Sequence, residues 1–85
     1  MAFYQILSWQ DIPSQIKAWD NFDEVRVELS QKFVAKIDQV AQSEGLTGTD
    51  DFLDQWKWGD ELEREGTPAD VAEAVRTELE ASFKR

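Results

Sequence analysis

The side chains with chemical potential in this chain are carboxylates, because the sequence contains no histidine and no cysteine. Imidazole bases, thiolate nucleophiles and cysteine-ligated metal centres are therefore excluded. Many of the acids gather in one stretch, as Asp50, Asp51, Asp54, Asp60, Glu61, Glu63 and Glu65. They lack the spacing of a calcium-binding loop, and a solvated run of acids does not bring two carboxylates together in a cleft for catalysis. The run therefore predicts a solvated acidic face, and we expect no metal, no cofactor and no catalytic residue.

A second group of polar residues lies where a turn is expected to meet a strand. Asp11 and Gln15 flank this point and could form a small binding feature beside Trp9 and Trp19. If the two strands pair as neighbours, their alternation puts both tryptophans on the same face of a sheet. The alternative is turn chemistry alone, in which Asp11 accepts hydrogen bonds from nearby amides and Gln15 satisfies a strand edge.

Two further tryptophans, Trp56 and Trp58, stand two residues apart in a segment expected to be helical. Their side chains would lie about 200° apart around the helix axis, so both cannot face one core. One of them is expected to be partly exposed, and exposed tryptophan is enriched in interface hot spots. The alternative is that the helix ends near Lys57 and Trp58 folds back over the sheet or the last helix. The candidate interaction surface comprises Trp9, Asp11, Gln15, Trp19 and Trp58.

Length and charge restrict the class of protein. A chain of 85 residues has room for one domain, and a domain of this size buries only roughly 60% of its unfolded surface. The net charge is −9, and most of the acidity lies in the second half of the sequence. Such a surface repels a phosphate backbone, so nucleic acid is not the expected partner. No stretch approaches the ~20 apolar residues of a membrane span. We therefore expect a soluble, cytoplasmic protein.

Hydrophobic spacing predicts the elements that must position these residues. Alternation predicts three strands over residues 2–9, 12–19 and 24–29, and short connections favour an antiparallel meander. Helical spacing predicts helices over residues 30–44, 49–58 and 67–83. Ser30, Thr49 and Thr67 are placed to accept hydrogen bonds at the helix starts, and Gly45 to end the first helix. The predicted fold is α+β: a three-stranded meander packed against two or three helices.

The stretch from Val25 to Gly45 is expected to organise this fold, because it passes directly from strand to helical spacing. Its helical part carries an apolar stripe made of Phe33, Ile37, Val40 and Ala41. A stripe of this kind faces the core in an amphipathic helix. We therefore expect it to hold the sheet and the later helices together.

Three sequence blocks resemble those of a known family. They run from Trp9 to Ile16, from Leu29 to Asp38 and from Thr49 to Trp56, within roughly residues 4–58. In order and spacing they look like the small bacterial virulence factor domain family, whose members occur as short proteins and as a domain of conserved virulence factor C. The family usually has a basic residue where Gln10 stands and a small one where Lys36 stands. The resemblance implies kinship but no reaction, ligand or catalytic residue.

These observations favour a small cytoplasmic protein-interaction module that is not an enzyme. One alternative is an accessory subunit or domain of an enzyme, which would supply the region of Asp11 and Gln15 to its partner's active site. A second is a transcriptional regulator, since the strand–helix–loop–helix order of residues 25–56 resembles a ribbon-helix-helix unit in outline. Glu28, Asp50 and Asp51 would face the DNA in such a unit, which argues against it. The partner and the oligomeric state stay open.

Overall fold

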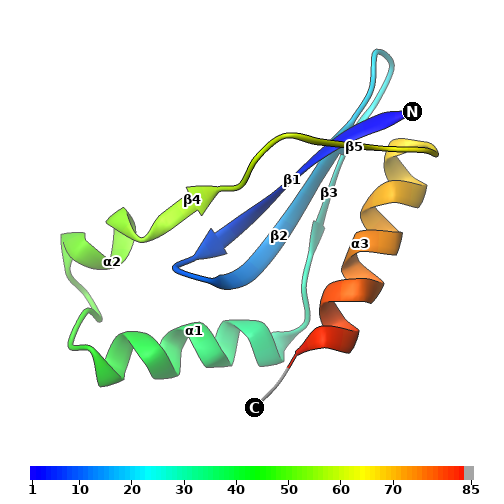
Figure 1. Cartoon of the computed structure of the whole chain (residues 1–85). Coiled ribbons are helices and arrows are strands. Elements are labelled where there is room, and N and C mark those ends of the chain that lie inside the picture. The colour runs from blue at the N-terminus through cyan, green and yellow to red at the C-terminus, as the bar shows by residue number, and fades with distance from the viewer. Residues whose placement is uncertain (84–85) are drawn as a thin grey trace.

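Residues 1–83 of the chain, as described by the computed structural model, form five strands and three helices (Figure 1). The strands are β1 (Ala2–Trp9), β2 (Ile12–Trp19), β3 (Glu24–Glu28), β4 (Trp56–Trp58) and β5 (Leu62–Arg64). The helices are α1 (Gln31–Ser43), α2 (Asp50–Asp54) and α3 (Pro68–Ser82). All strand pairs are antiparallel. The predicted α+β class and the N-terminal meander of three strands are confirmed.

The sheet is built around β1, which has neighbours on both sides. Its strand order is β3-β2-β1-β4, and β5 also pairs with β1. β4 lies opposite Leu7–Trp9 and β5 opposite Ala2–Tyr4, while the Gly59 amide between them donates to the Ile6 carbonyl at 2.8 Å. The segment from β4 to β5 thus follows β1 as one interrupted edge, and its hydrogen bonds satisfy backbone groups that would otherwise be unpaired.

The predicted helix over residues 49–58 is wrong beyond Asp54. Helix α2 has only five residues, and Trp56–Trp58 forms strand β4. Strand pairing determines the conformation here, because Trp56 lies opposite Trp9 and Trp58 opposite Leu7 in the register with β1. The alternative in which the helix ends early and Trp58 covers the sheet is closer to the structure. Strand β5 was not predicted, because its Glu63 and its acidic neighbours have low strand propensity.

Helices α1 and α3 cover one face of the sheet. The larger core cluster joins residues of β1, β2, α1 and α3 and contains Ala2, Ile16, Ala18, Leu29, Phe33, Val71, Ala72 and Val75. A smaller cluster contains Trp9, Ile37 and Ala41, with Phe52 and Trp56 packed against it. The buried residues of α1 are Phe33, Ile37 and Ala41, and Val40 is half-buried beside them. The predicted core-facing stripe of this helix is therefore confirmed.

The helix ends follow the predicted cap residues except at Ser30. Thr49 and Thr67 accept hydrogen bonds from the amides of Phe52 and Asp70, and Gly45 has the expected left-handed φ of 70°. Ser30 occupies the N-cap position of α1, but its hydroxyl makes no cap bond. It donates instead to a carboxylate oxygen of Glu80 at 2.8 Å, and the Ser30 amide donates to the other oxygen at 2.8 Å. The hydrogen bond to Glu80, fifty residues away in the sequence, thus replaces the local cap bond expected of the Ser30 hydroxyl.

Glu80 ties the end of α3 to the start of α1. Its carboxylate also lies 3.3 Å from the Lys32 ammonium, and its side chain is only 19% exposed. Burial raises the pKa of Glu80, but the hydrogen bonds from Ser30 and Lys32 outweigh burial and leave this pKa below its ordinary value. At the β2–β3 turn, hydrogen bonds from the amides of Phe22 and Asp23 lower the pKa of Asp20.

Replacing Phe33 with Ala should lower the free energy of unfolding by about 3–5 kcal/mol, because a buried aromatic ring leaves a cavity. Phe33 is 2% exposed, and its ring centroid lies 4.6 Å from that of Phe83. Urea denaturation followed by circular dichroism measures the loss. Val34→Ala on the exposed side of α1 is the control, with an expected change within about 0.5 kcal/mol. Equal losses in the two variants would show that α1 does not present this face to the core.

The depressed pKa values also predict acid sensitivity. A carboxylate whose folded pKa lies below its unfolded value contributes stability above the unfolded pKa and loses it as pH falls through the folded one. For Glu80 and Asp20 the ordinary values are 4.5 and 3.8. The free energy of unfolding should therefore fall on acidification below about pH 4.5. In denaturation series from pH 7 to pH 2, Glu80→Gln should flatten this dependence, whereas Glu61→Gln should keep the wild-type slope. A wild-type slope in Glu80→Gln would contradict the prediction.

Candidate functional site

The face of the sheet opposite α1 and α3 carries the candidate site. Side chains alternate along each strand, so cross-strand neighbours can be assigned to this face from the register as far as the irregularity between Leu7 and Ser8. Beyond this point the pair Trp9 and Trp56 belongs to the smaller core cluster. The outer face, as we name it, consists of Phe3, Gln5, Leu7, Gln15, Lys17, Trp19, Glu24, Arg26, Glu28, Trp58 and Glu63. None of these residues belongs to the two core clusters. Within residues 1–83, no helix packs over them.

Lys17 brings two tryptophans of the outer face together. Its ammonium nitrogen lies 4.7 Å from the ring centroid of Trp58 and 5.3 Å from that of Trp19. Both distances fit cation–π attraction. Phe3 extends the cluster, because its ring stacks on Trp19 with centroids 6.0 Å apart. The result is an aromatic cluster around a cation that has no ion pair with any carboxylate of residues 1–83.

The exposure of this cluster distinguishes it from the core. Trp58 is 40% exposed, whereas Phe3, Lys17 and Trp19 are half-buried. The charges around the cluster are mixed, since Arg26 pairs with Glu24 at 3.4 Å. A surface that combines wide, rigid rings with a few charged groups can bury apolar area against a partner at low cost in side-chain entropy.

Trp9 is a core residue, so its predicted place on an interaction surface is wrong. Its side chain is 0% exposed, its ring centroid lies 5.3 Å from that of Phe52, and its indole N–H donates to the Phe52 carbonyl at 2.8 Å. Trp9 also lies at the opposite end of the β1–β2 hairpin from Trp19: it pairs with Ile12, whereas Trp19 pairs with Phe3. The structure therefore does not bring these two tryptophans together.

Asp11 and Gln15 lie on different surfaces. Asp11 is exposed in the β1–β2 turn, its carboxylate makes no hydrogen bond within residues 1–83, and it lines a cavity on the helix side. Gln15 is half-buried on the outer face between Leu7 and Glu28. The expected shared feature is thus not formed, and the turn chemistry predicted for Asp11 is absent.

Gln10, next to Asp11, stabilises the β1–β2 turn. Its backbone has a left-handed φ of 55°, its amide donates to the Gln55 carbonyl at 3.1 Å, and its side-chain amide donates to Glu44 at 2.8 Å. These bonds connect the turn to the segments at the end of α1 and of α2. The turn is therefore supported by Gln10 rather than by Asp11.

Sequence reasoning missed three members of the aromatic cluster and its surroundings: Phe3, Leu7 and Lys17. A signal for them exists, because alternation already groups Phe3 with Leu7, and Lys17 with Trp19. The alternation does not reveal which face of the sheet the helices cover. The covered face is determined by α3 and by the edge formed by β4 and β5, which are distant in sequence from β1 and β2.

In the part of the chain from residue 1 to 83, no three acidic side chains are grouped so that they could hold a metal ion. Over the same residues, no helix combines the length and the apolar composition needed to cross a membrane.

A scan against protein-family models matches residues 7–85 to the virulence factor family. The chain belongs to this family. The match spans the three sequence blocks and continues through α3. Searches among curated proteins and among solved structures found no match.

The structure explains the three virulence factor blocks, because residues from all three meet in the core. Trp9 from the first block, Ile37 from the second, and Phe52 and Trp56 from the third meet in the smaller core cluster. At the position where the resemblance implies a basic residue, Gln10 donates to the Glu44 carboxylate. A basic side chain there could pair with the same carboxylate. These positions therefore maintain the fold and do not by themselves mark a binding site.

Replacing Trp9 with Phe should lower the free energy of unfolding by about 1–3 kcal/mol, because the Phe52 carbonyl loses its indole donor. Chemical denaturation followed by far-ultraviolet circular dichroism measures this loss. Trp58→Phe makes the same change at a partly exposed ring and should cost less than about 1 kcal/mol. The assignment of Trp9 to the core fails if the two variants lose equal stability.

Proposed function

We propose that this member of the virulence factor family is a non-enzymatic interaction module that binds a protein partner through its outer face. The observation that carries the proposal is the cluster of Trp19, Trp58 and Lys17 on a sheet face that no helix of residues 1–83 covers. Tryptophan and other aromatic residues are enriched at the centres of protein interfaces. We further propose that the protein works in the cytoplasm, where a chain without cysteine needs no oxidising compartment.

The backbone beneath the cluster suits a binding platform. Lys17 and Trp19 lie on the eight-residue strand β2, which is paired on both sides by β1 and β3. Trp58 lies on the short edge strand β4, held opposite Leu7 of β1. Rings fixed by a paired sheet lose little conformational freedom when a partner binds, which improves affinity.

The two other classes of function have weaker support. An enzyme accessory role through a joint Asp11–Gln15 site loses its basis, because the two side chains lie on different surfaces. A ribbon-helix-helix regulator uses strands paired between two chains in the groove of DNA. Here β3 pairs with β2 of its own chain, and α2, the second helix after β3, has only five residues. We therefore propose neither.

Affinity purification from the native cell, with the protein as bait, tests the proposal. Trp58→Ala and Trp19→Ala should reduce recovery of a specific protein partner at least tenfold, since truncated hot-spot residues cost about 2 kcal/mol or more. Phe22→Ala is the matched control: its ring is 89% exposed in the β2–β3 turn, outside the outer face. It should recover the partner as the wild type does. Circular dichroism verifies that each variant is folded.

The comparison among variants decides the outcome. If folded Trp58→Ala and Trp19→Ala recover every partner of the wild type, the outer face is not the interaction surface. Equal loss in Phe22→Ala would also contradict the proposal, because it would point to the β2–β3 turn. Titration of the purified partner against each variant then gives the change in Kd directly.

A further inference from the structure

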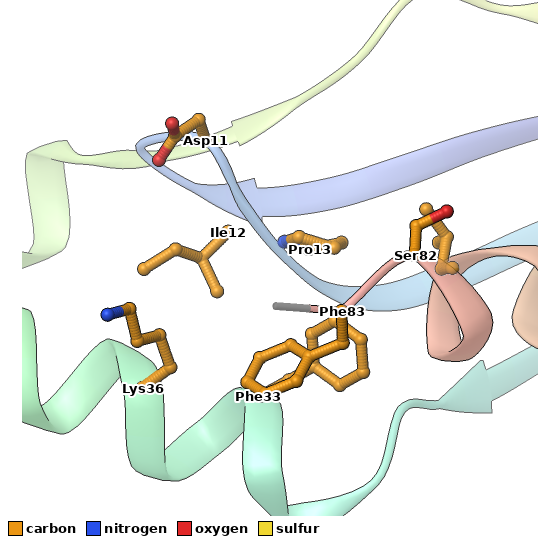
Figure 2. A pocket seen from close by; sticks show the side chains of 8 residues that line it. Asp11, Ile12, Pro13, Phe33, Lys36, Ser82 and Phe83 are labelled. Atoms are coloured by element: carbon orange, nitrogen blue, oxygen red, sulfur yellow. The ribbon is translucent and has the colours of Figure 1, made fainter. Parts of the chain in front are cut away.

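A cavity of about 420 Å³ lies on the helix side of the sheet, away from the outer face (Figure 2). It is bordered by the β1–β2 turn, by α1 and by the C-terminal end of α3, and it is open to solvent. The residues that line it are Asp11, Ile12, Pro13, Phe33, Lys36, Leu79, Ser82 and Phe83. Its volume falls within the range of about 300–1,000 Å³ that is usual for small-molecule sites.

The interior of this cavity is mainly apolar. Phe33 and Phe83 form one wall, with ring centroids 4.6 Å apart and the ring planes at 60°. Ile12, Pro13 and Leu79 add aliphatic surface from the turn and from α3. An apolar body of a ligand would therefore be in contact with carbon atoms on several sides.

Lys36 supplies one positive charge at the edge of the cavity. It is half-buried on α1 and has no ion pair with any carboxylate of residues 1–83. Lys32, one turn earlier, differs because Glu80 already neutralises it at 3.3 Å. Figure 2 shows Lys36 and Asp11 on opposite sides of Ile12, and these two side chains form no ion pair.

We propose that this cavity binds a small apolar carboxylate, with its carboxylate against the Lys36 ammonium and its chain against Phe33 and Phe83. A cation without an ion pair among residues 1–83, beside an apolar wall, is complementary to one anionic group on an apolar body. Nucleotides and other polyanions do not fit this pattern, because Lys36 is the one cationic side chain among the lining residues that the structure describes, and the Asp11 carboxylate lines the same cavity. The site is separate from the outer face, so the proposal does not depend on a protein partner.

Titration with three octyl compounds tests the ligand chemistry. Octanoate, octanol and octyltrimethylammonium share one chain and differ in the charge of the head group. Octanoate should bind at least tenfold more tightly than the other two and shift the NMR signals of Ile12, Phe33 and Leu79. Equal binding of all three compounds would overturn the proposal, as would octanoate shifts centred on Trp58.

Variants of two lysines test the role of the charge. Lys36→Met should weaken octanoate binding at least tenfold, and Lys36→Arg should restore it because the cation is kept. Lys57→Met is the matched control, since Lys57 is an exposed lysine of β4 with no ion pair within residues 1–83. Unchanged binding in Lys36→Met would contradict the proposal. Trp58→Ala should bind octanoate normally, so a failure here and a failure of the outer-face proposal can be told apart.

Discussion

The burial of Trp9 is the interaction on which the rest of the structure depends. Trp9 is the last residue of β1, and its ring packs against Ile37 of α1 and Phe52 of α2. Its indole N–H donates to the Phe52 carbonyl. Trp56 lies directly opposite it in β4. One side chain thus joins the sheet to both helices that follow it and positions the start of the edge strand. Because that edge carries Trp58, the geometry of the outer face depends on the core residue.

The four tryptophans divide into two roles that the sequence alone does not separate. Trp9 and Trp56 belong to the smaller core cluster, where they explain the virulence factor blocks. Trp19 and Trp58 lie on the outer face around Lys17, and neither belongs to a core cluster. The residues of the smaller core cluster and those of the proposed interaction surface therefore lie on different surfaces, as expected when a rigid scaffold presents an interaction site.

Local patterns were sufficient to predict β1, β2, β3, α1 and α3, because each carries a clear period and suitable turn or cap residues. They were insufficient between Gln55 and Arg64, where pairing with β1 overrides weak local preferences. Ser30 shows the same limit, since Glu80 of α3 replaces its local cap bond. Of the residues predicted for the candidate surface, Trp19 and Trp58 both lie beside Lys17. Burial removes Trp9 from this surface, and Asp11 and Gln15 lie apart.

Hydrogen exchange at the four indole N–H groups, followed by NMR in ²H₂O, tests this division of roles most directly. Single Trp→Phe variants assign the signals. Our account predicts that the Trp9 indole exchanges slowly, at rates close to those of global unfolding, because its N–H is buried and bonded to the Phe52 carbonyl. The partly exposed Trp58 indole should exchange far faster. If the Trp9 indole exchanges as fast as that of Trp58, Trp9 is not the anchor of the fold and the account is contradicted.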